Sequence, residues 1–318
     1  MKRAIQTLIF TAVVMTMTTP TVLAQESLEL LPAQGMVTMV VGPQGNSAIQ
    51  VGHEAVIVVD TQTPDVTEDF LAAIASLSDE PIRHIINTSA SAEHTGGNAA
   101  LSAAGTYVRL IDTFDPRGLD ANAAIMAHIN VLASMSAPIG DDFSVPEAAW
   151  PSDTYYTDEW SVYVNNEAIR MLHVPNAVTD GDTLVFFRRS DVVVTGDIFN
   201  TDRYPFFDPE QGGSINGIIN GLNTILDLAI AGENMIGGTV IIPGHGRMAD
   251  TTDVANVRDM VTIIRDRIQA MIDDGKSLRE VLAARPSMDY DAQFAGNRDS
   301  WTGDELVTTI YTDLSGGN

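Results

Sequence analysis

Short β-branched runs and amphipathic helical patterns alternate along this chain, and the same order occurs twice. Residues 35–135 open with apolar runs at 35–42 and 55–60 and continue into helical patterns, and residues 154–275 repeat this order. Short apolar runs bounded by glycine or an acid are typical of sheet strands, and a sheet must bury its apolar face against another layer. We therefore predict an α/β (α+β) fold, a four-layer αββα sandwich of two mixed β-sheets flanked by helices.

Hydrophobic spacing assigns the individual elements. Further strands are expected near residues 47–51, 82–87, 106–111, 154–156, 161–164, 168–174, 183–187, 191–194 and 239–242. Helices are expected at residues 64–77, 97–104, 118–135, 214–228, 254–274, 278–284 and 304–314, where apolar residues recur at helical spacing. The last helices, from about residue 250 to 318, are expected to form an extension of a single domain that covers residues 25–318.

The first 24 residues have the pattern of a secretory signal peptide. Lys2 and Arg3 precede an apolar stretch, and Val22 and Ala24 stand three and one positions before Gln25, as a signal peptidase requires. The alternative, an uncleaved anchor, is disfavoured because the apolar stretch is shorter than the roughly 20 residues that span a bilayer. We expect a secreted or periplasmic protein that is not inserted in a membrane after cleavage.

Charge and composition exclude several functions. The chain carries 42 acidic and 17 basic side chains, for a formal charge of −25, so polyanions such as nucleic acid are expected to be repelled. It has no cysteine, which rules out disulfides, thiolate metal ligands and a cysteine nucleophile. The expected partner is therefore a small-molecule substrate or ligand.

Four polar clusters each follow an apolar strand directly. Loops at strand ends of a rigid sheet are the usual place for binding and catalytic groups. The clusters occupy residues 87–98, 175–182, 195–197 and 243–246. In this order the four clusters resemble the motifs of the metallo-β-lactamase superfamily. The resemblance runs from about residue 35 to residue 245, and the C-terminal helices match one secreted branch more loosely. It implies an αββα sandwich and, in intact members, a two-zinc site that hydrolyses esters, thioesters, lactams or phosphodiesters.

The first motif departs from that family pattern. The family has H-x-H-x-D-H, and this chain has Ser89, Ser91, Glu93 and His94 at those four places. The third histidine of the first metal site is replaced by Val178. Serine hydroxyls are poor ligands for zinc, and a valine cannot coordinate a metal. The first metal site is therefore expected to be lost.

The second metal site keeps ligating side chains at all its positions. The resemblance assigns them to Glu93, His94, Asp197 and His245. Two imidazoles and two carboxylates can hold one zinc ion. Glutamate in place of aspartate moves the carboxylate by about one bond length, and a shift on the order of 1 Å is enough to slow catalysis strongly. We expect at most one zinc per chain and slow hydrolysis of an ester, lactam or related bond.

Several neighbouring residues are expected to assist this site. Glu93 or Asp197 is the expected general base. We expect Asp60 and Asp180 to orient the metal ligands rather than to bind metal themselves. Asp60 stands at the end of a buried strand. Arg203 and Tyr204 follow Asp197 closely along the chain and are expected to lie over the cleft and contact substrate.

The alternative is a metal-free pseudoenzyme that acts as a secreted binding module. In that case the four polar residues of the second site are hydrogen-bonded to one another and to water.

The other histidines of the chain are not expected to replace the missing ligands of the first site. His173 lies five positions before Val178, so on an extended strand the two side chains point to opposite faces. His128 is expected to be an interior histidine of the helix predicted at residues 118–135.

Overall fold

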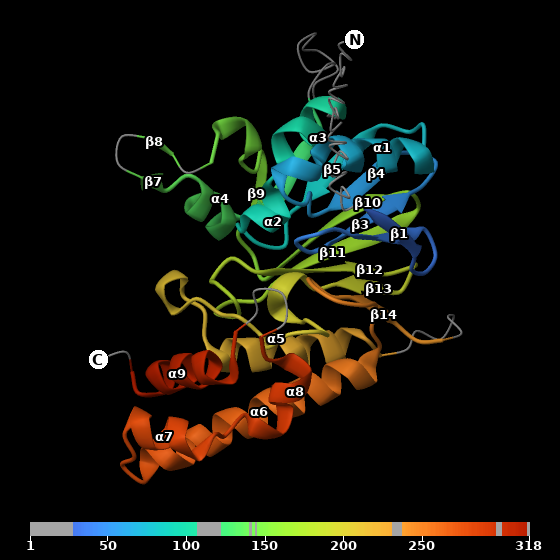
Figure 1. Cartoon of the computed structure of the whole chain (residues 1–318). Helices are drawn as coiled ribbons and strands as arrows, with labels where there is room; N and C mark the ends of the chain where they lie inside the picture. The colour runs from blue at the N-terminus through green and yellow to red at the C-terminus, as the bar shows by residue number, and fades with distance from the viewer. Residues whose placement is uncertain are drawn as a thin grey trace, which may run out of the picture.

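Two β-sheets pack face to face in the middle of the molecule, and helices cover the outer face of each sheet (Figure 1). This computed structural model describes residues 28–106, 122–139, 142–143, 145–230, 237–296 and 301–316. The predicted signal peptide, residues 1–24, lies outside the described residues, as does the stretch 107–111 of one predicted strand.

The first sheet is seven-stranded, with the order β1-β2-β3-β4-β5-β6-β9. The pairs β4–β5, β5–β6 and β6–β9 are parallel, and the pairs at the β1 end are antiparallel. The strands are β1 (Glu29–Pro32), β2 (Val37–Val41), β3 (Asn46–Val51), β4 (Val56–Val59), β5 (Ile82–Ile86), β6 (Ala124–His128) and β9 (Asp153–Tyr155). A separate hairpin joins β7 (Pro138–Ile139) and β8 (Asp142–Phe143).

The second sheet is five-stranded, with the order β10-β11-β12-β13-β14. Only the β13–β14 pair within it is parallel. The strands are β10 (Glu159–Val164), β11 (Glu167–His173), β12 (Thr183–Phe187), β13 (Val192–Val194) and β14 (Val240–Ile242). Both sheets are therefore mixed, as the sequence predicts.

The central core lies between the two sheets. Met39, Ile57 and Val59 of the first sheet pack against Met171 and Phe187 of the second, and all five side chains are buried. Burial of a side chain of this size contributes about 1.5–3 kcal/mol relative to exposure. This core holds the strand ends of both sheets in fixed positions.

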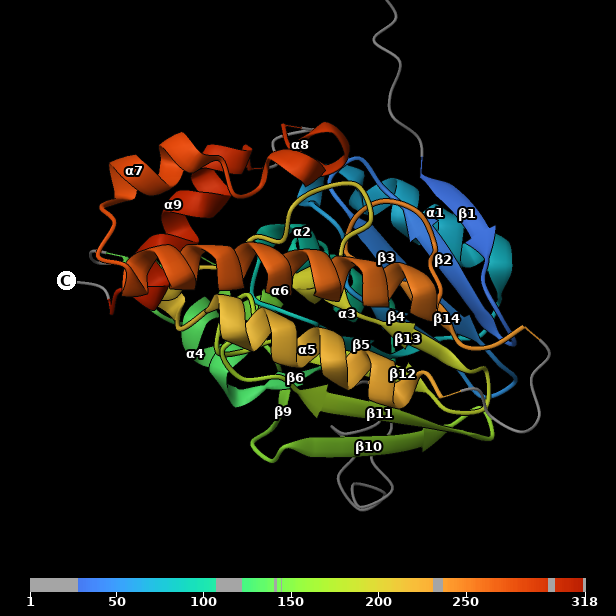
Figure 2. The same cartoon turned by 90° about the horizontal axis from the view of Figure 1, so that it is seen from below.

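The outer layers are helical (Figure 2). α1 (Thr67–Leu77) and α3 (Asn98–Ala104) cover the first sheet through Phe70, Ile74 and Leu101. α5 (Ile215–Leu228) and α6 (Thr251–Asp273) cover the second sheet, and they also pack against each other. The layers therefore form the predicted αββα sandwich.

The C-terminal helices pack on α6 and share its core. They are α7 (Leu278–Ala284), α8 (Met288–Phe294) and α9 (Gly303–Leu314). Val281, Phe294, Leu306 and Ile310 join the same buried cluster as Ile264 of α6. Among the described residues, no helix has both the length and the apolar character needed to cross a bilayer.

One predicted helix is wrong. The sequence predicts a helix over residues 118–135, of which the structure describes 122–135; there residues 124–128 form strand β6, and only α4 (Ile129–Met135) is a helix. All five residues of β6 are buried because the strand lies inside the sheet and is covered on both faces. A continuous apolar run of this kind has no strand alternation, so its spacing is the same as that of a buried helix.

Candidate metal centre

Glu93 and His94 lie on α2 (Ala92–Thr95), a single helical turn that follows β5. The carbonyl of His94 accepts a hydrogen bond from the Thr61 N–H at 2.9 Å and one from the Asn87 side-chain amide at 3.1 Å. These two donors follow β4 and β5 directly. The turn is thereby tied to the ends of two strands of the first sheet.

Asp197 and His245 lie on neighbouring loops of the second sheet. Asp197 is in η5 (Gly196–Ile198) after β13, and His245 follows β14. Because these two strands are parallel, their carboxyl ends meet at one edge of the sheet. Gly196 has φ 51°, and a Cβ there would lie 2.5 Å from Oγ1 of Thr88, so glycine is required for this close approach.

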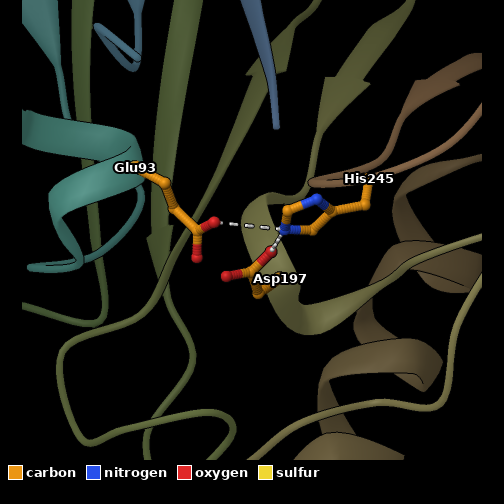
Figure 3. Close-up of side chains that lie close together, drawn as sticks. All are labelled: Glu93, Asp197 and His245. Atoms are coloured by element: carbon orange, nitrogen blue, oxygen red, sulfur yellow. Dashed lines mark ion pairs between the residues drawn. The ribbon is translucent and has the colours of Figure 1, made fainter. Parts of the chain in front are cut away.

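Three of the predicted ligands converge on one point (Figure 3). One ligand atom from each of Glu93, Asp197 and His245 lies within 4.8 Å of the other two. His245 Nε2 is 3.2 Å from Asp197 Oδ1 and 3.6 Å from Glu93 Oε2. The structure therefore brings together residues that lie up to 152 positions apart in the sequence (245 − 93).

His94 occupies a different place from the other three. Its ring is fully buried, with Nδ1 2.8 Å from Asp60 Oδ2 and Nε2 3.1 Å from Asp197 Oδ2. It is not part of the three-residue group, but its Nε2 faces the Asp197 carboxylate of that group. Asp60 also accepts hydrogen bonds from the Thr88 N–H at 2.8 Å and the Thr88 hydroxyl at 2.6 Å.

The carboxylates and imidazoles of this site shift one another's pKa values. Burial lowers the pKa of His94, but the carboxylates of Asp60 and Asp197 outweigh it and hold that pKa well above its usual value. Burial raises the pKa of Asp197, but His94 and His245 bring it below the usual range of a carboxyl. Burial and the nearby Asp197 raise the pKa of Glu93. Of these two carboxylates, Asp197 is therefore the more firmly ionised and Glu93 the more readily protonated.

The three converging side chains fit a divalent metal ion. Two carboxylates and an imidazole are ligands that zinc accepts. Oδ1 of Asp197 is buried and accepts no hydrogen bond from the described residues. It contacts His245 Nε2 at 3.2 Å as an ion pair without hydrogen-bond geometry, and a cation bound by both atoms would satisfy it.

The three residues that the resemblance places at the first-site histidine positions border the same cavity. The cavity has a volume of about 420 Å³, and Ser89, Ser91 and Val178 line it together with Glu93 and Asp197. The Ser91 hydroxyl donates a hydrogen bond to Glu93 Oε1 at 3.2 Å. The first-site positions therefore present hydroxyls and a methyl surface to the cavity where the family has imidazoles.

Asp180 lies outside the three-residue group. Its carboxylate accepts a hydrogen bond from the Asn130 side chain at 3.0 Å, and its carbonyl lies 2.8 Å from Nε2 of His173. Asp182, two residues later, is buried and accepts a hydrogen bond from the Thr179 N–H at 2.7 Å. Burial raises the pKa of Asp182 to about 7. The nearby carboxylate of Asp197 also raises the pKa of Asp182.

The expected placement of Arg203 and Tyr204 over the cavity is wrong. Tyr204 is buried, and its hydroxyl donates to Asp291 Oδ1 at 2.9 Å and to the Ser287 carbonyl at 3.2 Å. Arg203 pairs with its neighbour Asp202 at 3.0 Å. Tyr204 is directed away from the cavity because it fills the junction with the C-terminal helices. Phe206 of the same segment lines the cavity instead.

Two asparagines that the sequence did not single out hold the His245 loop. Asn200 Oδ1 accepts a hydrogen bond from the His245 N–H at 2.8 Å, and its Nδ2 donates to the Asp197 carbonyl at 3.2 Å. The Asn46 side-chain amide donates to the carbonyls of Pro243 and Gly246 at 2.9 and 3.0 Å. The only sequence signal was proximity, because Asn200 lies three residues after Asp197.

His173 and His128 are packed histidines. Their rings stack with centroids 3.6 Å apart, and His128 is the last residue of β6 rather than part of a helix. The hydrogen-bonded strand histidine predicted at position 173 is confirmed. Desolvation, with a smaller effect of His173, lowers the pKa of His128 to about 4.

Comparison with known proteins identifies the protein family to which this chain belongs. The sequence model of the metallo-beta-lactamase superfamily matches residues 40–256. The chain therefore belongs to the metallo-beta-lactamase superfamily. Its fold is the one found in hydrolases of this superfamily. No curated protein sequence matches the chain.

Similar solved structures have the same fold at low sequence identity. One is a metallo-beta-lactamase from Pontibacter korlensis, with 12% identity, a TM-score of 0.53, and coverage of 74% of this chain and 99% of that one. Another is the stereoselective inverting sec-alkylsulfatase Pisa1 from Pseudomonas sp., with 14% identity, a TM-score of 0.61 and coverage of 90% of this chain. This chain spans 50% of the sulfatase.

Proposed function

We propose that this protein is a hydrolase that uses one zinc ion, held by Glu93, Asp197 and His245 with His94 as a further ligand. The observation that carries the proposal is the convergence of two carboxylates and an imidazole around a buried Asp197 oxygen that accepts no hydrogen bond from the described residues. The first site of the family is lost in this proposal, because Ser89 and Val178 supply no strong ligand there.

A bound zinc ion would lower the pKa of a water molecule toward 7 and polarise the scissile carbonyl. The residues of this chain then have separate tasks. Asp60 holds the His94 ring by its Nδ1, so that Nε2 faces Asp197. Asp197 stays ionised because its pKa is below the usual range, and it acts as a ligand rather than as a proton acceptor.

Glu93 is the proposed general base, in the state in which its carboxylate is released from the metal. Its raised pKa and its position on the cavity wall allow it to take a proton from water in the cavity. The oxygen of that water forms the new bond to the acyl carbon, and the bond to the leaving group breaks. The proton held by Glu93 then passes to the leaving group. Slow turnover is expected, because the charge clamp of a two-metal site is missing.

The competing proposal is a metal-free binding module. One observation favours it: His94 lies between Asp60 and Asp197, and its raised pKa makes it an imidazolium that neutralises the buried carboxylate without a metal. In that case zinc would have to displace a proton from His94, and the protein would not bind zinc at neutral pH.

Zinc content separates the two proposals. We would purify the protein without chelator, dialyse it against zinc, and measure zinc per chain by mass spectrometry. The hydrolase proposal predicts about one zinc per chain, lost in His245→Ala. His53→Ala, which removes an exposed histidine on a turn, is the matched control and should keep the ion. A wild-type chain without zinc after this treatment supports the binding module.

We also propose that the protein acts outside the cytoplasm, because residues 1–24 have the pattern of a cleaved signal. The mature protein in this proposal is one domain from residue 25, with the C-terminal helices as its extension. N-terminal sequencing of the protein from the periplasm or the medium should start at Gln25.

A further inference from the structure

The cavity beside the candidate metal centre is lined by three carboxylates. They belong to Glu93, Asp197 and Asp208. The lining residues within the described part of the chain include no lysine and no arginine. The other polar groups that line it are neutral hydroxyls and one amide.

One divalent ion does not balance these charges. Zinc held by Glu93 and Asp197 would compensate their two negative charges and leave the charge of Asp208. The Asp208 carboxylate accepts hydrogen bonds from the Glu210 N–H at 2.9 Å and the Gln211 side chain at 2.8 Å, and both donors are neutral. Among the described residues, Asp208 has no cationic partner at ion-pair distance.

An exposed aromatic ring lies beside this carboxylate in the sequence and lines the same cavity. The Phe206 side chain is 47% exposed, and its ring packs against Trp301 with centroids 4.9 Å apart. Packing against Trp301 restricts the motion of the ring. A carboxylate together with an aromatic face attracts an organic cation, which interacts with both the charge and the ring quadrupole.

We propose that the substrate of this cavity carries one ammonium group, bound by Asp208 and Phe206, and that anionic substrates are rejected. This inference rests on the proposed hydrolase site. The substrate is then an ester or amide of a cationic alcohol, amine or acid, whose reacting carbonyl faces Glu93. The charge of the whole molecule acts in the same direction, because a net charge of −25 repels anions and attracts cations to the surface.

The test measures binding separately from turnover. Isothermal titration of the zinc-treated full chain would use choline, its uncharged isostere 3,3-dimethylbutanol, and the anion isethionate. We expect choline to bind about tenfold more tightly than the uncharged isostere, and isethionate to show no binding. The preference should decrease with added salt, because it comes from charge.

Two variants that each remove one negative charge show which residue causes the preference for choline. Asp208→Asn should reduce the preference for choline to less than about twofold. Glu210→Gln removes one negative charge two residues away, from a side chain that does not line the cavity, and should leave the preference unchanged.

The inference is overturned if choline does not bind, if isethionate binds as tightly as choline, or if Asp208→Asn keeps the wild-type preference. These outcomes are distinct from failure of the hydrolase proposal. The protein could prefer choline and yet hydrolyse neither acetylcholine nor the acetate ester of 3,3-dimethylbutanol. That result would support the cation site and contradict the hydrolase proposal.

Discussion

Oδ2 of Asp60 lies 2.8 Å from Nδ1 of His94, and both side chains are buried. This contact fixes the orientation of the imidazole and determines which ring nitrogen carries a proton. A carboxylate at Nδ1 retains the Nδ1 proton, so that the other nitrogen, Nε2, is the one that can bind a metal. We therefore expect Asp60 to control metal binding at the proposed site through His94, although it is not one of the three converging side chains.

Asp60→Asn should lower zinc affinity by about 10–100-fold. The backbone of Asp60 has φ 60°, which asparagine tolerates, so the fold should persist. An amide Nδ2 at the position of Oδ2 would donate toward Nδ1 and shift the proton to Nε2, which then cannot bind zinc. Competition with a chromophoric chelator measures the affinity. Asp79→Asn, an exposed acid, is the control, and an unchanged affinity in Asp60→Asn would contradict the assigned role.

Asn200→Ala should weaken zinc binding and destabilise the protein. The variant leaves the buried His245 N–H without its acceptor and frees the loop that carries His245 from the loop of Asp197. An unsatisfied buried donor costs about 1–3 kcal/mol of unfolding free energy. Urea unfolding with and without zinc separates the two effects. Asn223→Ala, on an outer helix, is the control and should keep the stabilisation by zinc. If zinc stabilises the two variants equally, Asn200 does not link the loops of Asp197 and His245 as described.

The sequence indicated the site well because the family motifs follow strands. Glu93, Asp197 and His245 were all predicted as ligands, and the structure places them together. It did not indicate that His94 would pair with Asp60 and Asp197 and stay outside the three-residue group, because ring orientation depends on contacts with Asp60 across the fold. Asn200 is missed for the same reason, since its two partners lie in loops that follow two different strands.

Restoring imidazoles at the first site should add a second metal ion. The variant Ser89→His, Ser91→His and Val178→His places three nitrogen ligands on the cavity wall beside Asp197. We expect zinc content to rise by about one ion per chain and ester hydrolysis to accelerate, because a two-metal site stabilises the attacking and leaving oxygens. Mass spectrometry and a chromogenic ester assay measure the two effects. A folded variant with no additional zinc would show that these positions are not ligand positions.

Stability should fall as the pH decreases from 6.5 toward 4, because of His128. The pKa of His128 in the folded protein is lowered to about 4, so the unfolded chain takes up a proton below pH 6.5 before the folded chain does. His128→Phe keeps a stacked ring on His173 and removes this titration. Urea unfolding of chelator-treated protein should show a weaker pH dependence in this variant.

The control for this experiment is His53→Phe, which replaces an exposed histidine. It should keep the wild-type pH dependence between pH 6.5 and 4. If His128→Phe and His53→Phe have the same slope, the titration of His128 does not contribute to acid sensitivity.

The errors of fold prediction also have physical causes. Residues 124–128 lie in a strand that is covered on both faces, and their spacing with Ile129 and Leu132 matches a helix equally well. Tyr204 was placed over the cavity from its proximity to Asp197 in the sequence. Its position is instead determined by Asp291, which belongs to a C-terminal helix far along the chain.

The most direct test of the central claim is an anomalous difference map, collected at the zinc edge, from crystals of the full chain grown with zinc. We expect one peak, bounded by Glu93, Asp197 and His245. No peak at this point, or a peak only at a site elsewhere on the molecule, would contradict it.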